Sequence, residues 1–235
     1  MQWLEAFWTK EGKGIPKDAP KRTGLPLFAE IIAREWWELV KLNLLFLLFS
    51  LPLVTAPAAT FATATICRMM VEDRPVYLLR DFLEALRAHA MRATVWALVA
   101  GTAVIIGVGA ISAYAAAART SLFYAAPLAL SLVVTLFVTL WAACFVMVSV
   151  TEARPFWESL KLSALAALLR PLPLLAALAF VAALWIAHIL FYPVSVFMPA
   201  VMNFSLGMFA VAFGAQGVVA QVLARSEEEN TIQEP

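Results

Sequence analysis

The chain has 235 residues, of which 63% are hydrophobic and only 14% carry a charged side chain, and its formal net charge is +1. Soluble domains are about 45–50% apolar and about 25% charged. The composition excludes an ordinary soluble globule and predicts an all-α integral membrane protein, because several apolar runs reach the roughly 20 residues that a helix needs to cross a bilayer.

The first segment, residues 1–26, is predicted to be a basic cytoplasmic arm. Its lysines and arginines are interleaved with glycines and prolines, which oppose a regular helix. From Leu27 to Val40 the pattern becomes that of an amphipathic interfacial helix, with Trp36 and Trp37 beside acidic and basic residues. We expect a helical membrane domain over residues 27–224 and an acidic cytoplasmic tail over residues 225–235.

About six membrane segments are predicted, at residues 39–54, 58–71, 93–118, 122–150, 165–191 and 194–223. The first two are short and are broken by Pro52 and Pro57, which disfavour helix at the residue before them. A piece of about 15 residues reaches only about 22 Å at 1.5 Å per residue. The pair is interpreted as two tilted spans, with a re-entrant hairpin as the alternative. Either arrangement returns the chain to the side it left.

Between the second and third segments, Glu72 to Arg92 predicts an amphipathic helix along the cytoplasmic surface. The segmentation places 16 of the 17 lysines and arginines on one side of the membrane and only Arg119 on the other. Because cytoplasmic loops carry an excess of basic residues, both termini are predicted to be cytoplasmic.

An internal repeat is suggested by two hexapeptides that lie 80 residues apart, Glu72-Asp73-Arg74-Pro75-Val76-Tyr77 and Glu152-Ala153-Arg154-Pro155-Phe156-Trp157. Each stands between a segment that returns to the cytoplasm and an amphipathic helix. This fits two parallel halves of three segments, as in some transporters. Convergent interface chemistry explains the match equally well, since proline begins helices and aromatic residues favour the headgroup level.

Catalytic and metal-binding patterns are absent from the sequence: it contains no HExxH, GxSxG, Walker or CxxC motif. Cys67 and Cys144 are expected to be small buried apolar residues. We therefore predict a protein that is not an enzyme and has no cofactor and no metal.

Uncharged polar side chains within the segments are the candidates for lining a ligand path, because hydrocarbon penalises them unless they face a partner helix or a cavity. The six candidates are Asn43, Thr55, Thr135, Thr139, His188 and Asn203. For each, a structural role is the competing interpretation: Ser and Thr bond their own backbone, and Asn and His join helices to each other.

Four residues of the two hexapeptides are candidates for docking a partner or lipid headgroups: Arg74, Tyr77, Arg154 and Trp157. Nucleic acid is not expected, because the topology already explains the basic residues. Small residues four apart, at Ala103 and Gly107 and at Ala210 and Gly214, fit either packing inside the chain or a homodimer.

The sequence resembles the YesL-like family of bacterial integral membrane proteins, whose function is unknown. The resemblance lies in the run from Lys41 through Ser50-Leu51-Pro52 to Thr60, in Arg80-Asp81-Phe82 and Glu84-Ala85-Leu86, and in the arm around Thr9 to Ile15. It implies a multi-pass protein of the bacterial cytoplasmic (inner) membrane. Family members are frequently encoded beside carbohydrate ABC uptake systems, which implies an accessory or regulatory role beside a sugar ABC transporter. A stand-alone small-solute or sugar permease is the alternative.

Overall fold

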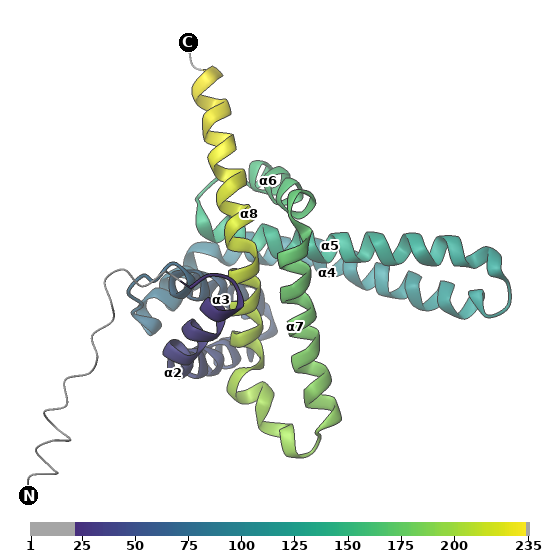
Figure 1. Cartoon of the computed structure of the whole chain (residues 1–235), viewed down its shortest axis with the longest axis horizontal. Coiled ribbons are helices and arrows are strands. Elements are labelled where there is room, and N and C mark those ends of the chain that lie inside the picture. Colours follow the sequence, from purple (N-terminus) through teal and green to yellow (C-terminus); the bar gives the residue numbers. More distant parts are fainter. Residues whose placement is uncertain (1–21, 234–235) are drawn as a thin grey trace, which may run out of the picture. The chain divides into compact units, whose positions relative to one another are not determined.

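The computed structural model describes residues 22–233, with side chains as far as residue 228, and the regular structure in this range is helical. Figure 1 shows the α-helices α2 (Leu25–Ser50), α3 (Ala56–Val71), α4 (Leu78–Ala118), α5 (Ala125–Thr151), α6 (Phe156–Leu169), α7 (Pro171–Leu190) and α8 (Phe204–Gln233). The all-α prediction is confirmed. Most of the predicted basic arm, and the last two residues of the predicted tail, lie outside the described residues.

Contacts divide the chain into two compact units, with the boundary after Arg34. In the described part of the first unit, Gly24 has a φ of 65° just before α2 begins, and Arg22 pairs with Glu30 at 3.5 Å. The second unit, Glu35–Pro235, contains the rest of α2 and all the other helices.

Prolines separate α2 from α3, as the sequence predicts. Helix α2 ends at Ser50, and a 3-10 turn, η1 (Leu53–Thr55), follows Pro52. Pro57 stands in the first turn of α3, where its missing N–H costs nothing. Most residues of α3 are buried, and the helix packs against α4, α5 and α8. None of its residues is exposed, as expected for a helix that other helices surround.

The prediction of a separate surface helix before the third segment is wrong, because helix α4 covers both. The charged stretch up to Arg92 was expected to lie along the membrane surface as a separate helix, whereas Leu78–Ala118 is one unbroken helix of 41 residues. At 1.5 Å per residue it is about 62 Å long, twice the roughly 30 Å of a bilayer core. The sequence offers no proline in this range at which the helix would stop.

The predicted segment 165–191 is also corrected, because it spans two helices. Helix α6 ends at Leu169 and α7 begins at Pro171, with Arg170 between them at φ −140° and ψ 70°. Pro171 removes a backbone donor and drives the preceding residue out of the helical region, which explains the division. Helix α6 packs mainly against α5 and α8.

The last predicted segment, 194–223, begins without an α-helix. A 3-10 turn, η3 (Val194–Phe197), and a π-helical turn, η4 (Pro199–Asn203), precede α8. Prolines 193 and 199 deprive this stretch of two backbone donors. Helix α8 then continues to Gln233, so that the predicted boundary of the tail at residue 225 does not coincide with a helix end.

The centre of the second unit is aromatic. The rings of Trp96 and Phe145 stack with centroids 4.1 Å apart, and Phe61 meets Phe145 edge-on at 6.4 Å. These residues come from α4, α5 and α3, so the three helices share one packed core.

Two glycines permit close helix approaches inside the chain. A Cβ atom at Gly107 of α4 would stand closer to Thr135 of α5 than the 3.0 Å that real Cβ atoms keep. A Cβ atom at Gly214 of α8 would stand 2.7 Å from the carbonyl oxygen of Pro173 in α7. Both glycines of the predicted small-residue pairs therefore serve contacts between helices of one chain.

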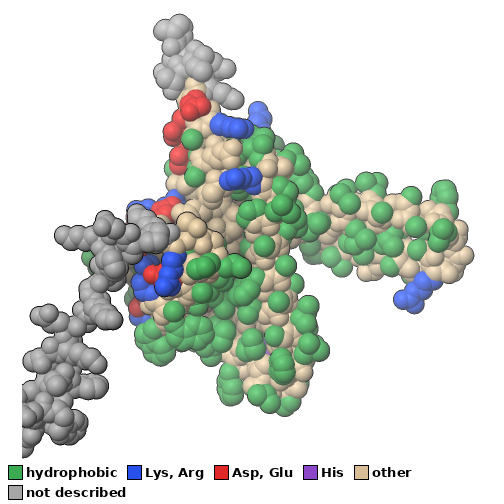
Figure 2. Space-filling model, in the orientation of Figure 1, with side chains coloured by type: hydrophobic (Ala, Val, Ile, Leu, Met, Phe, Trp, Pro, Cys, Tyr) green, Lys and Arg blue, Asp and Glu red, His purple; other side chains and the backbone are tan. Residues whose placement is uncertain are grey.

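Five helical stretches among the described residues are long and apolar enough to cross a membrane: Leu53–Val71, Leu78–Ala118, Leu122–Thr151, Pro171–Leu190 and Val194–Glu228. Figure 2 shows hydrophobic side chains over much of the α4–α5 and α7–α8 hairpins, and charged side chains where α6 meets α8. Helix α2 is not among the five, since its first half carries charged residues on several turns. The chain is thus a multi-pass membrane protein, and the total of six spans stays a prediction.

Candidate functional site

Asn43 joins α2 to the irregular start of α8. Its Nδ2 atom donates to the carbonyl oxygens of Pro199 and Ala200 at 2.9 and 2.7 Å, and its Oδ1 atom accepts from the backbone N–H groups of Phe204 and Ser205, each at 3.0 Å. The side chain is completely buried. All four hydrogen bonds end on backbone groups, so Asn43 stabilises the transition from the π-helical turn to α8.

Asn203 immediately precedes the backbone that Asn43 binds, and it behaves differently. Its side chain is 1% exposed, and neither Nδ2 nor Oδ1 has a hydrogen-bond partner among the residues that the structure describes. A buried polar group without a partner costs about 1–3 kcal/mol. Of the six ligand-path candidates, Asn203 alone has both polar atoms buried and unpaired.

The three threonine candidates bond to nearby backbone. The hydroxyls of Thr135 and Thr139 donate to the carbonyl oxygens four residues earlier, at 2.7 and 2.8 Å. The hydroxyl of Thr55 donates to the carbonyl oxygens of Phe49 and Pro52, which closes the turn between α2 and α3. Such local bonds satisfy the hydroxyl without any ligand.

His188 stabilises the turn that follows α7. Its Nδ1 atom lies 2.9 Å from the carbonyl oxygen of Ser195, and the Ser195 hydroxyl donates to the His188 carbonyl oxygen at 2.6 Å. The rings of His188 and Trp185 meet at right angles with centroids 6.1 Å apart. The six candidates are therefore distributed over the α2–α8 contact, the α2–α3 turn, α5 and the α7 turn, and they do not form one lining.

The two hexapeptides have different backbones. The first closes α3 with a Schellman motif: Arg74 N–H bonds the carbonyl oxygen of Met69 at 2.9 Å, Asp73 N–H bonds that of Met70 at 3.2 Å, and Asp73 has a φ of 55°. Aspartate tolerates this left-handed conformation. Alanine stands at the matching position of the second hexapeptide, where Glu152 is extended instead.

The two hexapeptide arginines consequently differ in environment. The side chain of Arg154 is 12% exposed and pairs with Glu152, Glu158 and Glu227, and it also donates to the hydroxyl of Ser226 at 2.9 Å. Burial by itself lowers the pKa of Arg154, but the hydrogen bonds and charges of Glu152 and Glu158 outweigh it and raise the pKa. Arg154 thus fastens α8 to the start of α6 and is not available for docking.

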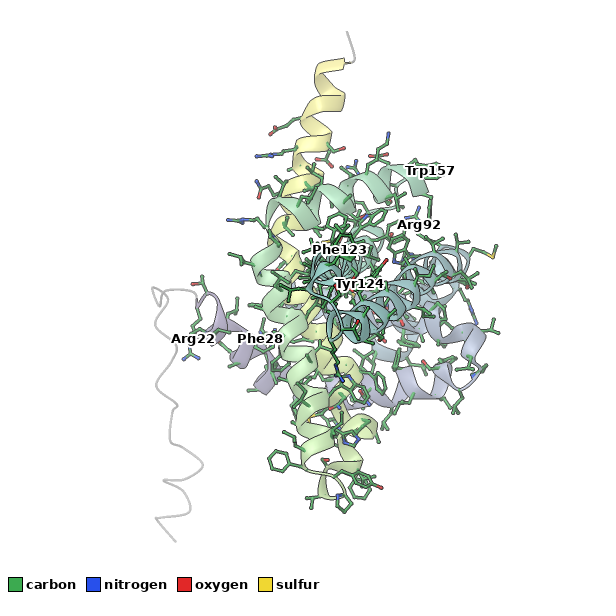
Figure 3. The ribbon with its side chains drawn as sticks, turned by 90° about the vertical axis from the view of Figure 1, so that its right-hand side faces the viewer. Arg22, Phe28, Arg92, Phe123, Tyr124 and Trp157 are labelled. Atoms are coloured by element: carbon green, nitrogen blue, oxygen red, sulfur yellow. The ribbon has the colours of Figure 1, made fainter. Side chains whose placement is uncertain are left out.

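Arg74 and the aromatic residues of the hexapeptides are accessible. The side chain of Arg74 is 53% exposed and has one contact with Glu72, at 3.5 Å. Tyr77 is 62% exposed and Trp157 is 71% exposed. Figure 3 shows Trp157 on the outer side of α6, with Arg92 below it. Three of the four predicted docking residues therefore lie on the surface.

Two further arginines, one in α3 and one in α4, bind the chain at and beside the second hexapeptide. Arg68 in α3 donates to the carbonyl oxygen of Thr151 at 3.0 Å, and Arg92 in α4 donates to the carbonyl oxygen of Arg154 and to the hydroxyl of Ser159. We define these contacts, with both hexapeptides, as the paired-loop face. The sequence does carry one signal for Arg68: an arginine at the end of an apolar segment indicates a specific polar contact.

A polar pocket of about 550 Å³ lies beside the first hexapeptide, between the end of α3 and the start of α4. Three arginines line it, Arg68, Arg74 and Arg80, together with the carboxylates of Asp81 and Glu84. We call it the basic pocket. The remaining lining residues are Thr65, Met69, Pro75, Tyr77, Ala85, Ala88 and His89.

A second pocket, of about 440 Å³, is lined almost entirely by apolar side chains from α3, α4, α5 and α8, including Phe61, Trp96 and Met208. Neither pocket is lined by any of the six ligand-path candidates. Within residues 22–233, no group of three or more His, Cys, Asp or Glu side chains is placed to hold a metal ion.

Comparison with known proteins gives one match. The model of a family described as a protein of unknown function, DUF624, matches residues 39–111, which is less than a third of the 235 residues. The matched segment contains Asn43, the whole of α3 and every residue that lines the basic pocket. No curated protein and no solved structure matches the chain.

Proposed function

We propose that this chain is a non-enzymatic membrane component that works by binding a partner protein at the paired-loop face. The resemblance of its first 90 residues to the YesL-like family supports a more specific role, as an accessory or regulatory partner of a sugar ABC transporter. The matched family model carries no function of its own, so the carbohydrate assignment rests on that resemblance alone.

The observation that carries the proposal is the construction of the paired-loop face. Arg68, at the end of α3, and Arg92, in α4, bond backbone carbonyl oxygens 83 and 62 residues further along the chain, at Thr151 and Arg154, and so fix the second hexapeptide against α3 and α4. Arg74, Tyr77 and Trp157 remain exposed around this fixed framework. Exposed aromatic residues and arginines on a rigid support are the side chains that protein interfaces use most effectively.

The proposed topology places the paired-loop face in the bacterial cytoplasm, with both termini on the same side. In this topology, α2 and α3 form a hairpin that returns the chain to the cytoplasm. Helices α4, α5, α7 and α8 then each cross the membrane once. The distribution of basic residues supports this arrangement, since Arg119 is then the one exception among 17 lysines and arginines.

The experiment is purification of the tagged protein from its native membranes in mild detergent, followed by mass spectrometry of the associated proteins. Trp157→Ala and Arg74→Gln change exposed residues of the paired-loop face. Lys161→Gln is the control, because Lys161 is an exposed cation of α6, one turn beyond Trp157.

We expect an ABC permease, its ATPase or a sugar-binding protein in stoichiometric amount with the unchanged protein and with Lys161→Gln, and its loss with the two variants. Recovery of the protein alone from native membranes would contradict the accessory role. Retention of the partner by both variants would show that the partner binds elsewhere.

A further inference from the structure

We propose that the basic pocket between α3 and α4 is a binding site for a phosphate group, carried either by a phospholipid headgroup or by a small soluble phosphate compound. The inference stands apart from the accessory role, because it concerns the isolated chain and needs no partner protein. It rests on charge, on hydrogen-bonding capacity and on the position of a helix end.

The charge balance of the pocket favours an anion. Three guanidinium groups line it against the two carboxylates of Asp81 and Glu84, and Glu72, outside the lining, reaches Arg74 and Arg68 only at 3.5 and 3.6 Å. Asp81 pairs with Arg80 at 2.9 Å and also accepts from the backbone N–H of Tyr77 at 2.8 Å. Arginine is the side chain best suited to phosphate, because its planar fork of donors matches the phosphate oxygens.

Arg68 supplies donors that the chain does not fully use. Within residues 22–233 its Nε atom is buried without a hydrogen-bond partner, and a carboxylate oxygen of Glu72 lies 3.6 Å away. Its NH1 atom is committed to the Thr151 carbonyl oxygen, which fixes the side chain in place at the pocket wall. Arg68 therefore brings an immobilised positive charge to the pocket wall, which favours an anionic ligand there.

Arg80 and Arg74 provide the accessible side of the site. The guanidinium carbon of Arg80 lies 4.4 Å from the centroid of the Tyr77 ring, a cation–π contact that orients Arg80 at the pocket. Arg74 is fixed at its backbone by the Schellman motif that ends α3, while among the described residues its guanidinium group contacts the carboxylate of Glu72, at 3.5 Å.

The start of α4 strengthens the preference for an anion. Tyr77 precedes the first residue of this 41-residue helix, and Tyr77, Arg80 and Asp81 all line the pocket. The N-terminus of a helix carries partial positive charge and favours phosphate groups. A phosphate has three or four oxygens to meet donors from several directions, whereas a carboxylate has two. The volume of about 550 Å³ admits a phosphate with its attached organic group.

The test uses the full chain purified in mild detergent. The main variant is the double substitution Arg74→Gln with Arg80→Gln, which removes two exposed charges from the pocket. The control variant is Arg87→Gln, because Arg87 is an exposed arginine of the same helix that does not line the basic pocket. Unfolding temperatures of all three proteins are measured first, to show that the substitutions leave the fold intact.

Binding is then measured for a short-chain phosphatidic acid, for the matching diacylglycerol without phosphate, for glycerol 3-phosphate and for inorganic phosphate. We expect saturable binding of a phosphate compound at one site per chain, weakened at least tenfold in the double variant and changed less than twofold by Arg87→Gln. The diacylglycerol should not compete. Binding should weaken with added salt.

The source of the phosphate is read from the same data. Competition by glycerol 3-phosphate or inorganic phosphate at millimolar concentration assigns a soluble compound, whereas binding of phosphatidic acid without such competition assigns a lipid headgroup. Equal binding by the double variant and the control, or equal binding of phosphatidic acid and diacylglycerol, would overturn the proposal. So would binding of a glutamate-rich peptide with no binding of any phosphate compound, since the pocket would then serve a protein partner.

Discussion

Replacing Asn43 should destabilise the contact between α2 and α8 more than any other single polar substitution among the ligand-path candidates. Asn43→Ala removes four hydrogen bonds to the backbone around η4 and the start of α8. Net contributions of about 0.5–1 kcal/mol for each bond give a loss of roughly 2–4 kcal/mol. For a chain of this length, this loss corresponds to a fall in unfolding temperature of roughly 4–16 °C.

The assay can use the protein's own thiols. Cys67 and Cys144 are both free and buried, so a maleimide dye that fluoresces on reaction reports unfolding in detergent. The Sγ atom of Cys67 lies 3.7 Å from the carbonyl oxygen of Ser205, next to the backbone that Asn43 binds.

Ser131→Ala is the matched control, because the Ser131 hydroxyl donates only to the carbonyl oxygen of Leu128 in its own helix. It should leave the unfolding temperature nearly unchanged. An Asn43→Ala protein that unfolds within about 2 °C of the unchanged protein would refute the assignment of Asn43 as a structural clamp, given the scale above.

Three further predictions follow from the packing and the charges. Gly107→Ala should lower the unfolding temperature by several degrees, because overpacking costs about 1–3 kcal/mol. Adding Thr135→Ala should recover most of the loss, because it removes the two nearest atoms, and Gly109→Ala, which meets nothing within 4 Å, should not lower the unfolding temperature. Arg154→Gln should lower the free energy of unfolding by about 1–3 kcal/mol, since it removes charge-assisted bonds that connect α6 to α8. The Arg74→Gln protein should unfold at the temperature of the unchanged protein. Equal unfolding temperatures for the two variants would contradict the assigned roles. A cysteine in place of Arg119 should react with an impermeant thiol reagent added outside the cell, and a cysteine in place of Lys161 should not; the reverse pattern would exclude the proposed topology.

The sequence predicted the breaks that proline imposes directly. Pro52 and Pro57 mark the end of α2 and the start of α3, and both effects are local. Pro171 carried the same information for the division between α6 and α7. It was missed because the long apolar run around it gave a stronger signal for one continuous span.

The continuity of α4 was not predictable from the pattern of hydrophobic residues. The change from charged to apolar residues at Arg92 resembles the border between a surface helix and a span. In the structure Arg92 bonds the second hexapeptide loop, and the helix passes through this point without a break. Local sequence reports the change in polarity, but not the tertiary contact that holds the two parts in one line.

Among the candidate polar residues, too, the sequence predicted hydrogen bonds to nearby residues but not those to residues far along the chain. The sequence left open that the threonines of α5 bond their own helix. In a helix, a threonine hydroxyl lies beside the carbonyl oxygen four residues earlier, and both hydroxyls bond there. The partners of Asn43 lie more than 150 residues away, and those of Arg154 in α8 lie about 70 residues away. Contacts between residues so far apart in the sequence depend on the fold, and the spacing of residue types along the chain does not predict them.

The most direct test of the proposed partner contact is photo-crosslinking in intact cells. A photoreactive amino acid replaces Trp157 on the paired-loop face in one protein and Lys161, one turn further along α6, in the control. We expect one crosslinked product from position 157, identified by mass spectrometry as a component of a sugar transporter, with much less from position 161. Crosslinks from position 157 to lipid alone, or equal and unrelated products from both positions, would contradict the proposed contact.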